Sequence, residues 1–227
     1  MIDVTLVPIL NDNYAYLLEG DGEIGIVDPG EATPILEALK TRGLSLDTVF
    51  ITHYHGDHIA GLDEIAAAYP DVKIMGAKHD HASSFAFAGE EVEVIETPGH
   101  KRDHVCFYFP KSQFVLSGDT LFAMGCGRVL DGTAEELYAS LQKLATLPDE
   151  TRVYCGHEYT LSNAKFCASV APDDAAIMER YSEVQALRDE GKPTIPSTIG
   201  AEKASNVFLH AKSAAEFAAL RTKKDSF

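Results

Sequence analysis

The strongest constraint on this chain is a set of histidines and aspartates that follow short apolar segments. The segment THYHGDH, residues 52–58, comes directly after the apolar run at 48–51. His100, Asp119 and His157 each follow a glycine at the end of another apolar, strand-like segment. Strands of this kind deliver the residues after them to one edge of a sheet, where polar side chains converge on a ligand. The pattern predicts an α/β domain with a polar site at one sheet edge.

The residue types in this set indicate a metal site. Imidazole and carboxylate groups suit zinc, iron or manganese, and neutral histidine is available as a ligand near pH 7. His53 and His55 are two residues apart in an extended segment, so they point the same way and can share one metal. Asp57 and His58 follow Gly56, which permits a sharp turn, so they can serve a second centre. A solvated histidine-rich loop is the alternative interpretation, and the further candidates at strand ends weigh against it.

Composition limits the function classes. The chain has 227 residues, enough for one large domain or for a domain with a small appendage. Its formal net charge of −16 argues against a nucleic-acid partner, which requires a cationic surface. Its four cysteines form no CxxC pair, so neither a disulfide framework nor a thiolate zinc site is indicated. Nothing resembles a signal peptide, and no apolar run reaches the roughly 20 residues of a membrane span, so a soluble, cytoplasmic protein is expected.

Strand-like and helix-like segments alternate along most of the chain. The strands are expected at 2–10, 14–20, 24–30, 47–53, 72–77, 91–100, 104–110, 112–120 and 151–157. The helices are expected at 33–43, 61–70, 133–148, 162–170 and 175–191. Thr33 is expected to cap the first of these helices, and Thr133 with Glu136 forms a capping box for another. From about Leu161 no further strand is expected. We therefore predict an α/β domain over residues 1–166 and a helical domain over 167–227.

Four motifs together resemble a known family: THYHGDH, TPGH at 97–100, SGDTLFAMGCGR at 117–128, and YCGHEYTLSNAKF at 154–166. They are similar to the metallo-β-lactamase superfamily and, within it, to the hydroxyacylglutathione hydrolase (glyoxalase II) family. The HxHxDH pattern identifies only the superfamily, whereas GHEYTLSNAKF, PTIPST and KKDSF are the more specific part. The resemblance covers nearly the whole chain. It implies a metallo-β-lactamase-like αββα sandwich followed by a small C-terminal α-helical domain that binds glutathione.

The resemblance also implies a ligand set for two divalent metal ions, with zinc expected and iron or manganese as alternatives. His53, His55 and His100 would hold the first metal, Asp57, His58 and His157 would hold the second, and Asp119 would bridge them. Asp57 would also orient the attacking hydroxide. The implied reaction is hydrolysis of S-D-lactoylglutathione and related 2-hydroxyacyl-glutathiones to glutathione and the free acid, the second step of methylglyoxal detoxification.

Substrate contacts follow from the resemblance position by position. Arg128, Tyr159, Arg221 and Lys224 match residues that bind glutathione in the family. Taken singly, Lys224 also fits a solvated terminal charge and Tyr159 also fits core packing. The family commonly has a tyrosine where this chain has Leu130, and loss of that hydroxyl is expected to weaken binding several-fold. A small-molecule thioester is the expected partner, with no nucleic acid and no membrane, and a monomer is expected.

Three alternatives stay open at this point. The first is a glutathione persulfide dioxygenase with a single iron, and the second is a lactonase or another hydrolase of the superfamily. The third is a metal-binding protein without turnover. Outside the proposed site, His79 and His81 are interpreted as surface residues, His104 as part of a loop or strand start, and residues 11–14 as a hairpin turn. His210 is given no role.

Overall fold

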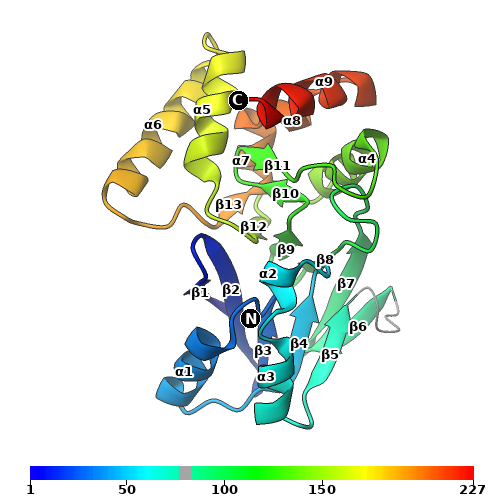
Figure 1. Cartoon of the computed structure of the whole chain (residues 1–227), viewed down its shortest axis with the longest axis vertical. Helices are drawn as coiled ribbons and strands as arrows, with labels where there is room; N and C mark the ends of the chain where they lie inside the picture. Colours follow the sequence, from blue (N-terminus) through cyan, green and yellow to red (C-terminus); the bar gives the residue numbers. More distant parts are fainter. Residues whose placement is uncertain (77–82) are drawn as a thin grey trace.

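The computed structural model describes residues 1–76 and 83–227 and contains two packed β-sheets flanked by helices (Figure 1). The first sheet has the order β1-β2-β3-β4-β5. Its strands are β1 Asp3–Ile9, β2 Asn13–Gly20, β3 Glu23–Val27, β4 Thr48–Ile51 and β5 Lys73–Gly76. The second sheet has the order β13-β12-β9-β8-β7-β6. Its strands are β6 Ser84–Phe87, β7 Glu90–Glu96, β8 Val105–Phe109, β9 Phe114–Gly118, β12 Arg152–Cys155 and β13 Ser197–Thr198.

Nine helices and a small hairpin complete the described part of the chain. The helices are α1 Ala32–Arg42, α2 Gly56–Ile59, α3 Leu62–Ala68, α4 Ala134–Ala145, α5 Thr160–Val170, α6 Ala175–Asp189, α7 Ile199–Ser205, α8 Val207–His210 and α9 Ala214–Asp225. The hairpin pairs β10 Leu121–Phe122 with β11 Gly125–Cys126. Among the described residues, no helix has the length and apolar character needed to cross a bilayer.

The fold has four layers, two central sheets with helices on each outer face, and an apolar cluster fills each of the three spaces between them. Phe50, Phe107 and Phe114 belong to the core between the two sheets. Val49 and Ile51, on the opposite face of β4, pack with apolar residues of α1 and α3. The outer face of the second sheet packs against α4 to α9 through a third cluster. Strand β4 is buried on both faces, as its continuous apolar sequence predicts. The αββα sandwich is confirmed.

Two details differ from the sequence prediction. Thr33 is not the cap of α1: that position is taken by Glu31, whose side chain makes no capping hydrogen bond, and Thr33 lies inside the first turn. Strand β13, at Ser197–Thr198, pairs with β12, so the expectation of no strand after Leu161 was wrong. By contrast, both hydrogen bonds of the Thr133–Glu136 capping box are present.

The predicted domain boundary between residues 166 and 167 falls inside α5. Helices α5 to α9 lie together in the upper part of the molecule, beside the ends of strands β9 and β12 (Figure 1). Because β13 belongs to the second sheet, the C-terminal segment also contributes to the sandwich. The division into two domains stays a prediction.

Candidate metal centre

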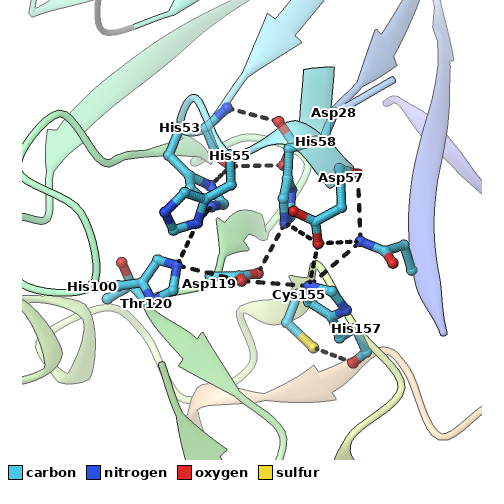
Figure 2. A network of polar contacts seen from close by, with 12 residues as sticks. Asp28, His53, His55, Asp57, His58, His100, Asp119, Thr120, Cys155 and His157 are labelled. Atoms are coloured by element: carbon cyan, nitrogen blue, oxygen red, sulfur yellow. Dashed lines mark hydrogen bonds and ion pairs between the residues drawn. The ribbon is translucent and has the colours of Figure 1, made fainter. Parts of the chain in front are cut away.

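The predicted ligand residues come from four segments that meet at one edge of the sandwich. His53 and His55 follow β4, and α2 carries Asp57 and His58 directly after them. His100, Asp119 and His157 follow β7, β9 and β12 respectively. The parallel pairing of β9 with β12 places Asp119 and His157 at the same end of the second sheet. Figure 2 shows these side chains pointing toward one another.

His53, His55 and His100 form the first group. One ligand atom from each lies within 4.8 Å of the others. The Nδ1 atom of His55 is 3.0 Å from Nε2 of His53 and 3.0 Å from Nε2 of His100. The His53 side chain is fully buried, and Nδ1 of His100 contacts the carbonyl oxygen of Arg128 at 2.8 Å. That contact leaves Nε2 of His100 facing the group.

Asp57, His58 and His157 form the second group, again with ligand atoms within 4.8 Å of one another. Oδ2 of Asp57 is 3.4 Å from Nε2 of His157 and 3.7 Å from Nε2 of His58. The two histidines are buried, whereas the Asp57 side chain is 42% exposed. Solvent therefore reaches the second group at Asp57.

The carboxylate of Asp119 lies between the two groups. Its Oδ1 is 3.5 Å from Nε2 of His58, and its Oδ2 is 3.4 Å from Nε2 of His157 and 3.6 Å from Nε2 of His100. One carboxylate thus faces residues of both groups. A shared carboxylate can offer an oxygen to each of two metal ions.

Two buried atoms at this point test whether a metal fits. Nε2 of His58 and Oδ1 of Asp119 have no hydrogen-bond partner in the part of the chain that the structure describes. Leaving such atoms buried and unpaired costs free energy, so a polar partner is needed. Imidazole nitrogens and carboxylate oxygens are a suitable donor set for a divalent transition metal. The residues fit two ions.

A third grouping, Asp28 with His53 and His58, also brings ligand atoms together. However, the carboxylate of Asp28 accepts hydrogen bonds from the backbone N–H of Thr52 at 2.8 Å and from its hydroxyl at 2.6 Å. Its Oδ2 is also 3.1 Å from Nδ1 of His58. Asp28 is thereby positioned to support His58 rather than to bind a metal itself.

The four residues predicted to bind glutathione line a cavity of about 290 Å³. It is lined by Phe122, Cys126, Arg128, Tyr159, Ser162, Asn163, Arg221, Lys224 and Asp225. The ring of Tyr159 stacks on His157, with centroids 4.5 Å apart, so the cavity adjoins the second ligand group. Leu130 is 56% exposed, and its backbone N–H donates to the carbonyl oxygen of His100.

Comparison with known proteins agrees with this architecture. Residues 10–84 and 82–157 match the metallo-beta-lactamase superfamily, and residues 158–227 match the family described as hydroxyacylglutathione hydrolase C-terminus. A hydroxyacylglutathione hydrolase of Acidiphilium cryptum is 44% identical over 99% of this chain and 96% of its own length. One from Roseobacter denitrificans is 39% identical over 100% and 99% of the two chains.

The full-length similarity decides the family. The chain belongs to the hydroxyacylglutathione hydrolases. Among solved structures, the chain is similar to TTHA1623 in a di-iron-bound form, with a TM-score of 0.66 and 25% identity. That match covers 91% of this chain and 100% of the other.

The pKa values of the histidines in the two ligand groups shift in opposite directions. Burial and the neighbouring histidines hold the pKa of His53 well below its usual value, and burial also lowers the pKa of His100. Burial acts in the same direction on His58 and His157, but carboxylates outweigh it. Asp119 and Asp28 hold the pKa of His58 well above its usual value, and Asp119 and Asp57 raise the pKa of His157 to about 10.

The pKa values of the carboxylates of Asp57 and Asp119 are lowered. The hydrogen bond with His157 is the main cause that holds the pKa of Asp57 well below its usual range. Burial raises the pKa of Asp119, but His58 and His157 outweigh burial and hold it well below its usual value. These directions favour the protonated forms of His58 and His157 beside the two anions in the metal-free protein. A divalent cation that binds here replaces those protons.

Four supporting residues were not assigned to the site from the sequence. His104 accepts a hydrogen bond at Nε2 from the backbone N–H of Asp119, at 3.0 Å, and its ring stacks on His53. Asp12 lies 2.8 Å from Nδ1 of His157, and Asn13 donates to Oδ2 of Asp57 at 3.0 Å. Asp28, described above, is the fourth.

The remaining candidates can be placed as follows. His104 directly precedes β8, as predicted, and it is buried. His79 and His81 lie outside the described residues. His210 contacts the carbonyl oxygen of Lys203 at 2.8 Å. All four cysteines are free and buried, and burial raises the pKa of the Cys155 thiol to about 12.

Proposed function

We propose that this chain is a dinuclear-metal thioester hydrolase that converts S-D-lactoylglutathione and related 2-hydroxyacyl-glutathiones to glutathione and the free hydroxy acid. The observation that carries the proposal is the position of Asp119, whose carboxylate faces both ligand groups. The cationic cavity beside His157 supports the choice of an anionic thiol carrier. The names of the full-length relatives support the same substrate class.

In this proposal His53, His55 and His100 would hold one ion, Asp57, His58 and His157 would hold the other, and Asp119 would be shared between them. When bound, a divalent pair lowers the pKa of water and polarises a carbonyl oxygen. Asp57 is anionic and half-exposed, so it can accept a hydrogen bond from the attacking water and orient it toward the thioester carbonyl. The leaving group is a thiolate, which needs no strong general acid at the sulfur.

The cavity residues bind the glutathione part in this proposal. Arg128 and Lys224 supply positive charge, and Tyr159 presents a hydroxyl beside the second ligand group. Arg221 is buried, with Nη1 donating to the carbonyl oxygen of Cys126 at 2.9 Å, so it also fixes the loop that carries Arg128. Removing Arg221 is therefore expected to affect folding as well as substrate binding.

Zinc is the metal we propose, with iron or manganese as alternatives that accept the same ligands. A di-iron form of a similar protein supports iron as a real alternative. We also propose a monomeric, cytoplasmic enzyme. The four free cysteines fit a reducing compartment, and the net charge of −16 opposes self-association.

The test combines thioester loss, followed by absorbance, with metal content by elemental analysis. We expect hydrolysis of S-D-lactoylglutathione by protein that holds about two metal ions per chain, and loss of activity on chelation. S-D-lactoyl-N-acetylcysteine, which has the same thioester without the tripeptide, should be a much poorer substrate. His210→Asn serves as the matched control for substitutions of the proposed ligands.

Fully metallated protein that leaves S-D-lactoylglutathione intact would contradict the proposal. Oxygen consumption with glutathione persulfide by protein holding one iron per chain would instead favour the dioxygenase alternative. Equal rates with S-D-lactoylglutathione and S-D-lactoyl-N-acetylcysteine would support thioester hydrolysis but contradict the proposed recognition of glutathione.

A further inference from the structure

Asp225 is a carboxylate inside a cavity that otherwise suits an anion. It is the last residue of α9 and lines the cavity with Arg128, Arg221 and Lys224. Its Oδ1 is 3.0 Å from Nη2 of Arg221 and 3.5 Å from Nε of Arg128. The two arginines come from different elements, because Arg221 lies on α9 whereas Arg128 follows β11. One oxygen therefore lies between two guanidinium groups from separate parts of the fold.

The position of Asp225 is unfavourable on local grounds. The C-terminal end of a helix carries partial negative charge, which favours cations and disfavours anions in the last turn. Lys223 and Lys224 in the same turn follow that rule, and Asp225 does not. A residue that breaks a local rule commonly serves a site. The two arginine contacts are the compensation that the structure offers.

The two arginines differ in how firmly they are held. Arg221 is buried, its Nη1 bonds the carbonyl oxygen of Cys126, and its guanidinium lies over the ring of Phe208 at 5.1 Å. The Arg128 side chain is 68% exposed. A long exposed side chain must lose rotational freedom when it binds a ligand, and that loss weakens binding. Asp225 connects the exposed arginine to the fixed one.

The contact also determines which edge of Arg128 is available. A guanidinium group offers five N–H donors, and its planar edges match a carboxylate in a bidentate manner. Asp225 lies against Nε, so it leaves the edge formed by the two Nη atoms for another partner. The cavity then has three cationic side chains and one anionic side chain among its lining residues, and it keeps a positive balance.

We propose that Asp225 is a positioning residue that holds Arg128 beside Arg221, so that Arg128 presents its Nη edge to a carboxylate of the substrate. The inference rests on the proposed function, which already places Arg128 against glutathione, and deepens it by adding Asp225 as the residue that orders Arg128. The opposite role would be competition, in which Asp225 occupies the place of that carboxylate and weakens substrate binding.

Asp225→Asn tests the inference, because it keeps the shape of the side chain and removes the charge. In the metal-loaded enzyme we expect KM for S-D-lactoylglutathione and Kd for glutathione by calorimetry to rise about two- to tenfold, the scale of one side chain that must be ordered on binding. The value of kcat should stay within about twofold, because Asp225 acts on ground-state binding. Asp189→Asn is the matched control, since Asp189 is the last residue of α6 and bonds Gln185.

Two further measurements separate positioning from a general loss of structure. The glycine ethyl ester of glutathione lacks one carboxylate, and its affinity should be weaker and unaffected by Asp225→Asn. In the background Arg128→Met, the added change Asp225→Asn should have no further effect on KM. The melting temperature of each variant shows whether the protein remains folded. Arg128→Met leaves α9 unchanged, and it should likewise weaken the binding of glutathione but not that of its glycine ethyl ester.

A fall in KM on Asp225→Asn would overturn the inference in favour of competition. Unchanged KM, an equal effect on the ester, or an undiminished effect in the Arg128→Met background would also overturn it. If the wild-type enzyme hydrolyses the thioester and binds glutathione in any of these cases, only the inference fails. If the wild-type protein does neither, the proposed function and the inference fail together.

Discussion

The ring of Tyr159 lies parallel to the imidazole of His157, with centroids 4.5 Å apart and planes inclined by 8°. Tyr159 lines the cationic cavity, and His157 belongs to the second ligand group. Phe122 packs edge-on against both rings. The side chain therefore has two separable parts: a ring that supports a proposed metal ligand and a hydroxyl that is available to substrate.

The two parts of Tyr159 can be tested by two substitutions. Tyr159→Phe keeps the stacked ring, so we expect full metal content and a KM raised about two- to tenfold by loss of one hydrogen bond. Tyr159→Ala removes the ring, and we expect about tenfold weaker binding of the second metal, as for other residues that orient a ligand. Competition with a chelator measures that affinity. Equal metal loss in both variants would contradict the division of roles.

Asp119→Asn is expected to weaken metal binding at the position shared by the two ligand groups. The amide keeps the shape of the side chain but removes the negative charge that lies 3.4 Å to 3.6 Å from three histidine nitrogens. We expect about one metal ion per chain in place of two, and a loss of activity of at least about 100-fold. Elemental analysis and the thioester assay measure the two effects. Asp63→Asn, on the exposed side of α3, is the control, and an active variant with two metals would refute the shared carboxylate.

The convergence of the seven proposed ligands could be predicted because each one follows a strand and most follow a glycine. That pattern is local in the sequence. The supporting residues could not be found in this way. His104 lies at the start of β8, and it reaches the site because β8 runs antiparallel to β9. Asp28 directly follows β3, but the residue before it is Val27 instead of a glycine, and its backbone is left-handed, with φ of 48°.

Two further features were not predicted from the sequence, and each omission has a physical cause. Asp12 and Asn13 are typical turn residues, so their local role in the β1–β2 hairpin hid their contacts with His157 and Asp57. Strand β13 is two residues long and is defined by pairing with β12, which precedes it by more than forty positions. Such a strand has no periodicity of its own to detect.

The stability of the metal-free protein should fall as the pH rises above about 6.5. The pKa values of His58 and His157 are raised in the folded state, that of His157 from 6.5 to about 10. Each histidine therefore contributes stability that is complete below the unfolded pKa and is lost as the pH rises toward the folded pKa. The lowered pKa values of His53 and His104 affect stability only below about pH 6.5, where acid destabilises the folded protein because these buried histidines resist protonation.

Urea unfolding of the chelated protein between about pH 6.5 and 9 measures this slope. We expect the free energy of unfolding to decline across the range, and we expect His157→Asn to flatten the decline. The metal-loaded protein should lack it, because a bound cation replaces the protons. A free energy of unfolding that rises with pH in the chelated protein would contradict the charge balance assigned to His58 and His157.

Leu130→Tyr is expected to strengthen glutathione binding. The family resemblance implies a tyrosine at this position, and here the leucine is 56% exposed beside the loop of His100. One added hydrogen bond of about 0.5 to 1.5 kcal/mol corresponds to a KM lowered about two- to tenfold, with kcat unchanged. Leu130→Phe separates the hydroxyl from the ring. If phenylalanine lowers KM as much as tyrosine does, the gain comes from apolar contact, and a KM raised by both would show that Leu130 fits the substrate of this enzyme better than the family residue.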